Sequence, residues 1–259
     1  MKVLIKLGGT LLDDPAACAA LAAQIAGLPS GVQAVVVHGG GKQMTRFLAE
    51  RGVESRFVGG LRVTSPEIVD AVLKVFAGSV NKGLVGALRH AGANAAGLSG
   101  IDGGLALAVQ RDPALGAVGR IVSADARILD ALLAGGFLPV VACVAGGTAG
   151  EVFNVNADQM AVACAGAWKA DRLLFLTDVP GVKGGDGAII PRITASGARA
   201  LIADGIATGG MQAKLEAACD ALAQGVAEVR IAAGAQPGIV AAMLSGAGSG
   251  TALVAEGAG

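Results

Sequence analysis

The stretch VLIKLGG, residues 3 to 9, is an apolar run that ends in two glycines, and the same pattern recurs along the chain. Similar runs are AVVVHGGG at 34 to 41, FLPVVACVAGG at 137 to 147 and VRIAAG at 229 to 234, whereas LLFLTDVPG at 173 to 181 ends in a Pro-Gly turn. Continuous apolar runs bounded by glycine are typical of strands that are buried on both faces of a parallel sheet. We therefore expect a mainly parallel central sheet.

Segments with helical signals separate these strands. Asp14 and the proline after it begin an Ala-rich segment that a glycine ends, which matches an N-cap, a first-turn proline and a C-terminal glycine. The longest predicted helix spans residues 66 to 90 and carries an apolar stripe of 3.6-residue period. The pattern over residues 105 to 124 predicts a hairpin or another excursion off the main sheet, and that over residues 182 to 192 predicts an exposed turn.

Strands that alternate with helices predict an α/β fold, an open αβα sandwich with right-handed crossovers. Ligands of such sheets bind beyond the carboxyl ends of the strands. We expect two lobes, residues 1 to 165 and residues 166 to 259.

The composition excludes several classes of protein. The 259 residues include 20 Lys and Arg against 20 Asp and Glu, and only 3% are aromatic, so nucleic acid is not an expected partner. No apolar run reaches the roughly 18 residues of a membrane span, and Lys6 interrupts the N-terminal run before a secretory segment could form. The four cysteines are scattered without a CxxC pair, which favours neither a zinc site nor a disulfide framework. We expect a cytoplasmic protein that makes no membrane contact.

Two glycine-rich turns are candidate phosphate sites. Gly8-Gly9 and Gly39-Gly40-Gly41 each follow a predicted strand, where backbone N–H groups and a helix N-terminus form an anion pocket. The sequence contains no GxxxxGK[ST], no strict GxGxxG, no His-Arg-Asp loop and no GxSxG elbow. These absences disfavour Walker-type NTPases, dinucleotide-binding enzymes, protein kinases and serine hydrolases, and leave a phosphate-handling α/β protein.

Six segments, in this order and spacing, closely resemble the amino acid kinase family and within it the branch that phosphorylates N-acetylglutamate. They are KLGGTLLD at 6 to 13, HGGGK at 38 to 42, GLRVTS at 60 to 65, FNVNADQ at 153 to 159, LTDVPGV at 176 to 182 and GGMQAKL at 209 to 215. The resemblance covers essentially the whole chain and implies the carbamate kinase-like fold. It implies that ATP phosphorylates the side-chain carboxylate of N-acetyl-L-glutamate, a step of arginine biosynthesis. It also places the acceptor in the first lobe and ATP in the second.

The resemblance assigns the catalytic residues to Lys6, Lys214 and Asp158. Lys6 would stand on the acceptor side of the phosphoryl group, Lys214 on the ATP side, and Asp158 would hold both ammonium groups in place. Because a carboxylate acceptor is already ionised at neutral pH, the reaction needs positive charge and N–H donors rather than a general base. Lys214 could otherwise be an ordinary solvated lysine on a helix.

The resemblance also assigns residues to the acceptor. They are Gly40, Gly41, Arg62 and Asn154. Arg62 would grip the α-carboxylate and Asn154 would recognise the acetamido group. Arg62 could instead be a surface arginine and Asn154 an Asx turn or helix cap, and Asn156 could equally be that cap. His38 is interpreted as a structural neighbour without a catalytic role.

For the nucleotide, the resemblance implies two glycines after the first strand and residues from two later loops. They are Gly8, Gly9, Asp178, Val179, Pro180, Gly181, Val182, Lys183, Ile206, Ala207, Thr208 and Gly210. Gly8 and Gly9, with Gly40 and Gly41, would donate main-chain N–H groups to the phosphoryl oxygens and the attacking carboxylate. Mg²⁺ would be held by ATP phosphates and water, so no protein metal ligand is nominated.

The expected assembly is a homodimer, with the helix over residues 66 to 90 as the candidate interface. Because the sequence begins two residues before its first predicted strand, we expect it to lack the N-terminal extension of arginine-inhibited relatives. A carrier-linked aminoadipate or glutamate kinase of the same family is the nearest alternative. A catalytically silent amino-acid or nucleotide sensor and a non-Rossmann oxidoreductase are more distant ones.

Overall fold

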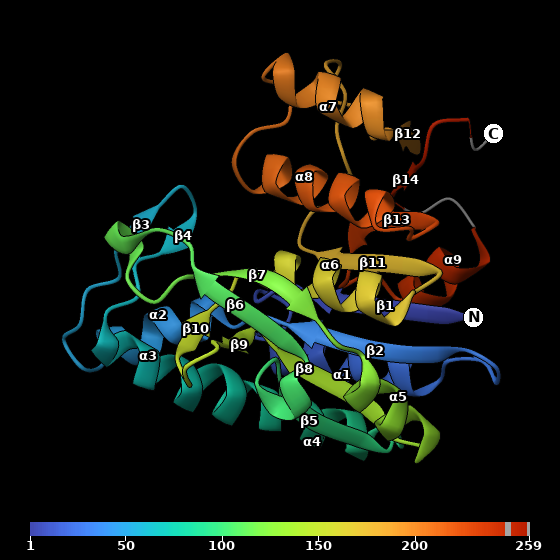
Figure 1. Ribbon diagram of the computed structural model, residues 1–259. Coiled ribbons are helices and arrows are strands. Elements are labelled where there is room, and N and C mark those ends of the chain that lie inside the picture. The colour runs from blue at the N-terminus through green and yellow to red at the C-terminus, as the bar shows by residue number, and fades with distance from the viewer. Residues whose placement is uncertain (247–249, 258–259) are drawn as a thin grey trace.

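The computed structural model describes residues 1–246 and 250–257. In this part of the chain eight strands form one sheet in the order β12-β14-β13-β11-β1-β2-β8-β5 (Figure 1). Its strands are β1 (Lys2–Leu7), β2 (Gln33–His38), β5 (Ala95–Ser99), β8 (Leu138–Ala142), β11 (Arg172–Thr177), β12 (Arg192–Thr194), β13 (Glu228–Ala233) and β14 (Thr251–Val254). Neighbouring strands are parallel except β13 and β14. The mainly parallel sheet is confirmed.

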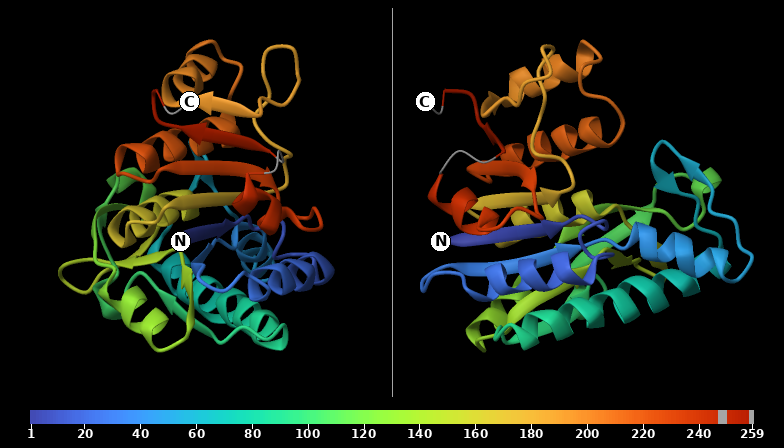
Figure 2. Two further views of the ribbon diagram at one scale, coloured as in Figure 1. Left: turned by 90° about the vertical axis from the view of Figure 1, so that its right-hand side faces the viewer. Right: turned by 180° about the vertical axis from the view of Figure 1, so that it is seen from behind.

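Helices cover both faces of this sheet. Seen from behind, α1 (Pro15–Ala26) and the helix that ends in α4 (Asn81–His90) lie across one face, and α9 (Ile239–Ser245) packs on the same side (Figure 2). The other face carries α6 (Ala157–Trp168) and α8 (Gly209–Ala223), with α5 (Arg127–Ala134) and α7 (Ala195–Ala203) toward the margins. This arrangement confirms the αβα sandwich. Residue 165, the expected lobe boundary, falls inside α6.

Strand β1 divides its side chains between the two hydrophobic layers. Val3, Ile5 and Leu7 pack in the layer of α1 and α9, whereas Leu4 packs in the layer of α6 and α8. Side chains of a strand alternate between faces, so Lys6 projects to the same face as Leu4. The sequence pattern of β1 therefore directs one lysine toward α6.

The predicted helix over residues 66 to 90 is continuous but not uniform. It consists of α3 (Pro66–Val72), a π-helical segment (Leu73–Val80) and α4. The Ser65 hydroxyl caps it by accepting the Ile68 N–H at 3.4 Å. π-helical segments are rare and often lie at functional sites. Here the segment packs beside α2 (Gly41–Ala49), next to the second glycine-rich turn.

A second sheet of four strands has the order β10-β9-β6-β7. Its strands are β6 (Ala106–Gln110), β7 (Gly119–Ala124), β9 (Val144–Gly146) and β10 (Val152–Asn154), and β3 (Phe57–Val58) with β4 (Leu61–Arg62) forms a separate small hairpin. Antiparallel β6 and β7 confirm the predicted hairpin. The run at 137 to 147 is divided, because β8 ends at Ala142 and Val144 pairs instead with Asn154 in the second sheet.

Other local predictions also stand. The Asp14 carboxylate accepts the Ala16 N–H at the start of α1, and Gly27 ends this helix. Residues 185 to 188 form an exposed turn, although Val182 at its base is buried. All four cysteines, each within the described residues, are free thiols. Within the described ranges, we find no helix of the length and apolarity that a membrane crossing requires.

Candidate active site

Two lysines meet one aspartate above the carboxyl end of the main sheet. Lys6 Nζ lies 2.6 Å from Asp158 Oδ1, and Lys214 Nζ lies 3.5 Å from Asp158 Oδ2. Lys6 comes from β1, Asp158 from the first turn of α6 and Lys214 from α8. The structure thus brings together the three predicted catalytic residues from three elements far apart in the sequence.

Burial strengthens the electrostatic interactions within this cluster. Lys6 is 7% exposed and Asp158 is 6% exposed. Burial alone would raise the pKa of Asp158, but the ammonium groups of Lys6 and Lys214 outweigh it, and the pKa is lowered from its ordinary value. Asp158 is therefore ionised at neutral pH. Two lysines and one carboxylate leave a net positive charge that suits a phosphoryl group.

The turns that were predicted to bind anions face each other beside this cluster. A Cβ atom built on Gly9 would lie 3.5 Å from the Gly41 nitrogen and 3.9 Å from the Gly40 nitrogen. Gly40 and Gly41 begin α2, and among the described residues no side chain caps its first turn. Gly8 differs from the prediction, because its N–H already donates to the Leu176 carbonyl at 2.8 Å within the sheet. Gly9, Gly40 and Gly41 remain as candidate donors.

A cavity of about 150 Å³ adjoins the glycines. The predicted acceptor residues Gly40, Gly41, Arg62 and Asn154 all line it. Arg62 is 5% exposed, so the interpretation as a surface arginine is wrong. Its guanidinium donates to the Gly41 carbonyl at 3.0 Å, to Thr45 Oγ1 at 2.9 Å and to Ser55 Oγ, and it stacks on the Phe57 ring.

These contacts hold the Arg62 guanidinium rigidly at the cavity wall. Burial lowers the pKa of Arg62 from its usual value, yet an arginine remains charged in a protein. The sequence pattern did not identify Ser55 or Thr45. Thr45 lies one helical turn after Gly41, a spacing that predicts proximity to the turn, whereas nothing near Ser55 marks it in advance.

The two asparagines of FNVNADQ have different roles. Asn156 is the N-cap of α6, and its Oδ1 accepts the N–H groups of Asp158 and Gln159 at 2.8 and 3.3 Å. Asn154 ends β10 and donates to Thr64 Oγ1 at 3.0 Å. The cap is therefore Asn156, and Asn154 is available to the cavity. By capping α6, Asn156 also fixes the turn that carries Asp158.

A second cavity of about 300 Å³ contains most of the predicted nucleotide residues. It is lined by Val179, Pro180, Gly181, Lys183, Ile206, Ala207, Thr208 and Met211. Val182 is not among the lining residues, because its side chain is fully buried and its N–H donates to Thr251 Oγ1 at 2.8 Å. Asp178 and Gly210 are exposed beside the cavity.

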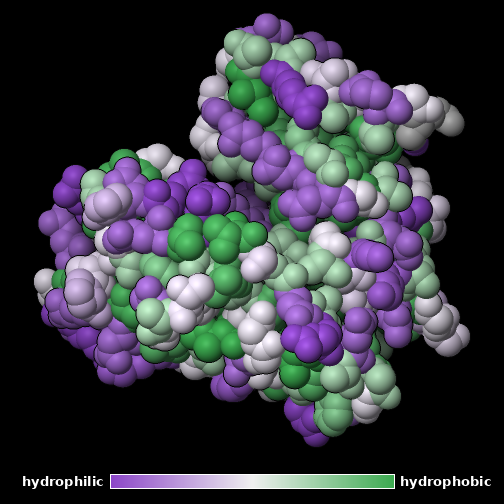
Figure 3. Space-filling model, in the orientation of Figure 1, coloured by the Kyte–Doolittle hydropathy of each residue, from purple (hydrophilic) through white to green (hydrophobic). Residues whose placement is uncertain are grey.

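The start of α8 connects this cavity to the lysine cluster. Thr208 lines the cavity, α8 begins at Gly209, and Lys214 lies about one and a half turns further along the same helix. Among the described residues no side chain caps the first turn of α8, so its N–H groups and the helix dipole suit a phosphate chain. The surface is hollowed between the part that carries α7 and α8 and the part that carries β3 and β4 (Figure 3).

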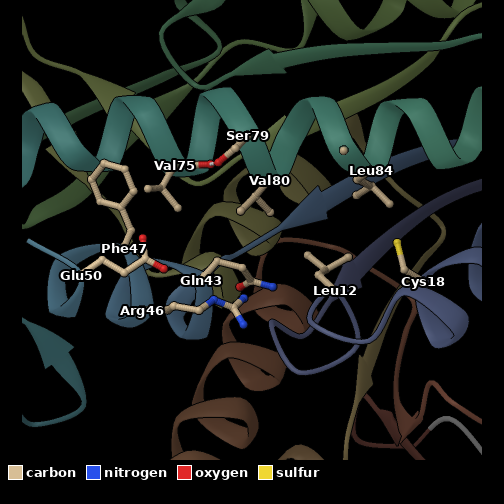
Figure 4. A pocket seen from close by; sticks show the side chains of 11 residues that line it. Leu12, Cys18, Gln43, Arg46, Phe47, Glu50, Val75, Ser79, Val80 and Leu84 are labelled. Atoms are coloured by element: carbon tan, nitrogen blue, oxygen red, sulfur yellow. Dashed lines mark hydrogen bonds between the residues drawn. The ribbon is translucent and has the colours of Figure 1, made fainter.

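A third cavity, of about 330 Å³, lies on the other side of α2 (Figure 4). Gln43, Arg46 and Phe47 of α2 face Val75 and neighbouring residues of the π-helical segment across it. None of the predicted site residues lines this cavity. It is separate from the cavity beside Arg62, although residues of α2 line both.

Comparisons with known proteins agree with this geometry. The amino acid kinase family matches residues 1–233. An acetylglutamate kinase from Solibacter usitatus is 60% identical over 255 residues, which are 98% of this chain and 99% of that protein. An acetylglutamate kinase from Acidobacterium capsulatum is 47% identical over 234 residues, 89% of this chain and 90% of that protein.

A solved structure is similar over nearly the whole chain. N-acetylglutamate synthase from Neisseria gonorrhoeae, complexed with coenzyme A and N-acetyl-glutamate, has a TM-score of 0.85 and 25% identity. The similarity covers 98% of this chain and 59% of that one. The sequence and structure matches thus include every segment that contributes to the lysine cluster and the two cavities beside it.

Proposed function

The chain belongs to the amino acid kinase family, and we propose that it transfers the γ-phosphoryl group of ATP to the side-chain carboxylate of N-acetyl-L-glutamate. The products are N-acetyl-L-glutamyl 5-phosphate and ADP, in the arginine biosynthesis of the cytoplasm. The relatives named acetylglutamate kinase support this assignment. The single observation that carries it is the convergence of Lys6 and Lys214 on Asp158.

The lysine cluster answers the main difficulty of this reaction. An anionic carboxylate attacks an anionic phosphoryl group, and charge spreads over the oxygens in transit. Lys6 neutralises that charge from the acceptor side and Lys214 from the ATP side. Asp158 offsets the repulsion between the two ammonium groups and fixes their positions, so the lysines need not rearrange during the reaction. A silent sensor has no need of this paired charge.

The acceptor occupies the cavity between the glycines and Arg62. The guanidinium pairs with the α-carboxylate, and its hydrogen bonds to Gly41, Thr45 and Ser55 fix the direction of that pairing. Asn154 offers a donor and an acceptor to the acetamido group. A cavity of about 150 Å³ suits a small amino acid derivative.

ATP occupies the second cavity with its phosphates toward the first turn of α8. Aliphatic side chains and backbone groups hold the base, because the lining residues include no aromatic ring. Mg²⁺ would be held mainly by phosphates and water and would neutralise charge on the leaving group. The first lobe, residues 1 to 165, then carries the acceptor and the second lobe, residues 166 to 259, carries ATP.

We place the homodimer interface on the long helix of residues 66 to 90. Gly83 and Gly86 are exposed on it, and a Cβ atom on either would have no described atom within 4 Å beyond its chain neighbours and the adjacent backbone of its own helix. Glycine inside a helix costs about 1 kcal/mol relative to alanine, and nothing within the described chain requires it at these two positions. Close approach of a second copy would explain both residues.

The activity is tested by measuring acceptor-dependent ADP release together with acyl phosphate trapped by hydroxylamine. N-acetyl-L-glutamate, glutamate and aminoadipate are compared at equal concentration. We expect N-acetyl-L-glutamate to be the preferred acceptor. Preference for glutamate or aminoadipate would favour the carrier-linked branch of the family, and absence of product with all three would favour a sensor.

A further inference from the structure

The second glycine-rich turn is held from beneath by a buried histidine. His38 is the last residue of β2 and is fully buried. Its Nδ1 lies 2.7 Å from the carbonyl oxygen of Gly39. Because a carbonyl oxygen only accepts hydrogen bonds, Nδ1 carries the proton and donates it.

Asn81 fixes this protonation state from the other side of the ring. Its Nδ2 lies 3.0 Å from His38 Nε2 and 2.9 Å from the Val140 carbonyl oxygen, while its Oδ1 accepts from Lys82 Nζ at 3.1 Å. The Lys82 and Val140 partners define which end of the amide is nitrogen, so Nδ2 donates to Nε2. His38 is therefore neutral with its proton on Nδ1.

The environment of the ring keeps it neutral. The pKa of His38 is lowered to about 4, chiefly by burial and to a smaller extent by the nearby Lys82 ammonium, whereas the hydrogen bond to Gly39 acts in the opposite direction. At physiological pH the ring thus has one donor and one acceptor, each matched to a partner. Asn81 is itself fully buried, and a Cβ atom on Gly97 would lie only 2.0 Å from its Oδ1.

The bond to Gly39 determines where the next N–H group points. Every peptide bond among the described residues is trans, and the C=O and N–H of a trans peptide point in opposite directions. The Gly39 carbonyl points toward the buried ring, so the Gly40 N–H points away from it. A Cβ atom built on Gly9 would lie 3.9 Å from the Gly40 nitrogen, and Gly40 lines the acceptor cavity.

From this geometry we infer that His38 and Asn81 form a positioning pair, which fixes the Gly39–Gly40 peptide so that the Gly40 N–H faces the reacting oxygens. The inference rests on the proposed function, since it assigns that N–H to the phosphoryl transfer site. A peptide between two glycines rotates easily, and a rotated peptide would present a carbonyl oxygen to an anion. The pair prevents that rotation and preorganises the donor. Neither residue touches the substrate.

The kinetic test compares two substitutions of His38. His38→Leu fills similar space but cannot donate, whereas His38→Asn places an amide nitrogen near the position of Nδ1. We expect His38→Leu to lower kcat by about 10- to 100-fold, less than the full loss of an oxyanion donor. His38→Asn should recover kcat to within about fivefold of the wild-type value, and KM for ATP should change less than about threefold in both variants.

A stability control separates positioning from folding. Leu88→Ala removes a buried side chain near the end of α4, away from the glycine turn, and lowers the Tm without touching the pair. Its kcat should match the wild-type value. Unchanged kcat in His38→Leu, or equal loss in His38→Asn and His38→Leu, would overturn the inference.

A spectroscopic test does not depend on the substrate. The chain has two histidines, so His90→Gln leaves His38 as the only imidazole in a ¹⁵N-labelled protein. Long-range ¹H–¹⁵N correlations should show a protonated Nδ1 and an unprotonated Nε2 between pH 6 and 8. A proton on Nε2 would contradict the proposed pairing of His38 with Asn81. A wrong assignment of the phosphoryl acceptor would leave this spectrum unchanged and would show only in the activity assay of the wild-type protein.

Discussion

Lys6 lies where an unpaired charge would be very costly. It lies on β1 of the central sheet, which is the middle layer of the sandwich. Its neighbours on the adjacent parallel strands are Val37 and Phe175. Burial of an unpaired ammonium group costs several kcal/mol, and here Asp158 at 2.6 Å offsets that cost. A buried ion pair is weak evidence for a gain in stability. The presence of Lys6 and Asp158 in the core is therefore better explained by a role in the proposed reaction.

Lys6→Ala should abolish most turnover and leave nucleotide binding nearly intact. The substitution removes the charge proposed for the acceptor side, while the cavity proposed for the nucleotide is lined by other residues. We expect kcat to fall by about 100-fold or more, with less than about a threefold change in the dissociation constant for ATP. Single-turnover kinetics and calorimetry measure the two quantities.

A control for this substitution is Arg127→Ala, which removes a cation from an exposed ion pair with Asp125. It should leave both quantities unchanged. If Lys6→Ala retained the wild-type kcat, Lys6 would have no part in the chemistry.

The buried His38 should make stability depend on pH. Its pKa is about 4 in the folded protein, against about 6.5 for an unfolded histidine, so the unfolded chain binds more protons between these values. Stability from this group is complete above pH 6.5 and is lost as the pH falls toward 4. The expected loss between pH 7 and pH 5 is about 2 kcal/mol.

Urea unfolding at pH 7 and pH 5 measures this loss. His38→Asn removes the titrating ring, so the free energy of unfolding of this variant should fall about 2 kcal/mol less than that of the wild-type protein over the same range. The contributions of all other groups cancel in the comparison. Identical pH dependence of the two proteins would show that His38 is not held neutral by the fold.

At the scale of elements, the site is assembled from the ends of strands and the starts of helices. Gly9, two residues after the end of β1, lies close to the start of α2. A methyl group on Gly9 would cover the Gly40 and Gly41 nitrogens. At 3.5 and 3.9 Å such a methyl group fits without a clash. The absence of a side chain at Gly9 is thus not required for packing.

Gly9→Ala should therefore fold normally and lose activity. We expect a change in the free energy of unfolding below about 1 kcal/mol and a fall in kcat of about 100-fold or more, because the methyl group occupies the space of the reacting oxygens. Gly40→Ala is the contrasting variant. Its Cβ would lie 2.9 Å from the Phe76 ring and should lower the Tm as well. A fully active Gly9→Ala variant would exclude its neighbouring N–H groups from catalysis.

Much of this element-level arrangement was predictable from the sequence. Apolar runs such as VLIKLGG give the strands, and Asp14 and Ser65 mark helix starts, because these signals are local. The π-helical segment and the break at Cys143 were not predictable, since both arise from packing between elements distant in the sequence. For the same reason the pairing of His38 with Asn81, 43 residues away, has no signal in the sequence.

The predicted site residues divide in the same way. Lys6, Asp158 and Lys214 were identified by resemblance, and the structure brings them together. The amide of Gly8 and the side chain of Val182 are instead used by the fold, through the Leu176 carbonyl and the core. Sequence position alone does not tell whether a loop residue faces a ligand or the interior.

At the scale of the whole molecule, the long helix is the proposed contact between two copies. Gly86→Arg adds a long charged side chain to an exposed position that a second copy would cover. We expect the wild-type protein to be a dimer and this variant to be a monomer by light scattering after size-exclusion chromatography. Ala200→Arg makes the same change on the exposed face of α7, at the other end of the molecule, and should remain a dimer (Figure 1). A monomeric wild-type protein, or a dimeric Gly86→Arg, would remove the long helix from the interface.

The account as a whole depends on two ammonium groups reaching one phosphoryl group from opposite sides. The most direct measurement is a crystal structure with ADP, Mg²⁺, N-acetyl-L-glutamate and aluminium fluoride as a mimic of the phosphoryl group in transit. We predict that the Nζ atoms of Lys6 and Lys214 both lie within about 3 Å of fluoride or of the oxygens in line with it. A mimic contacted by only one of these lysines, or bound away from Asp158, would contradict the account.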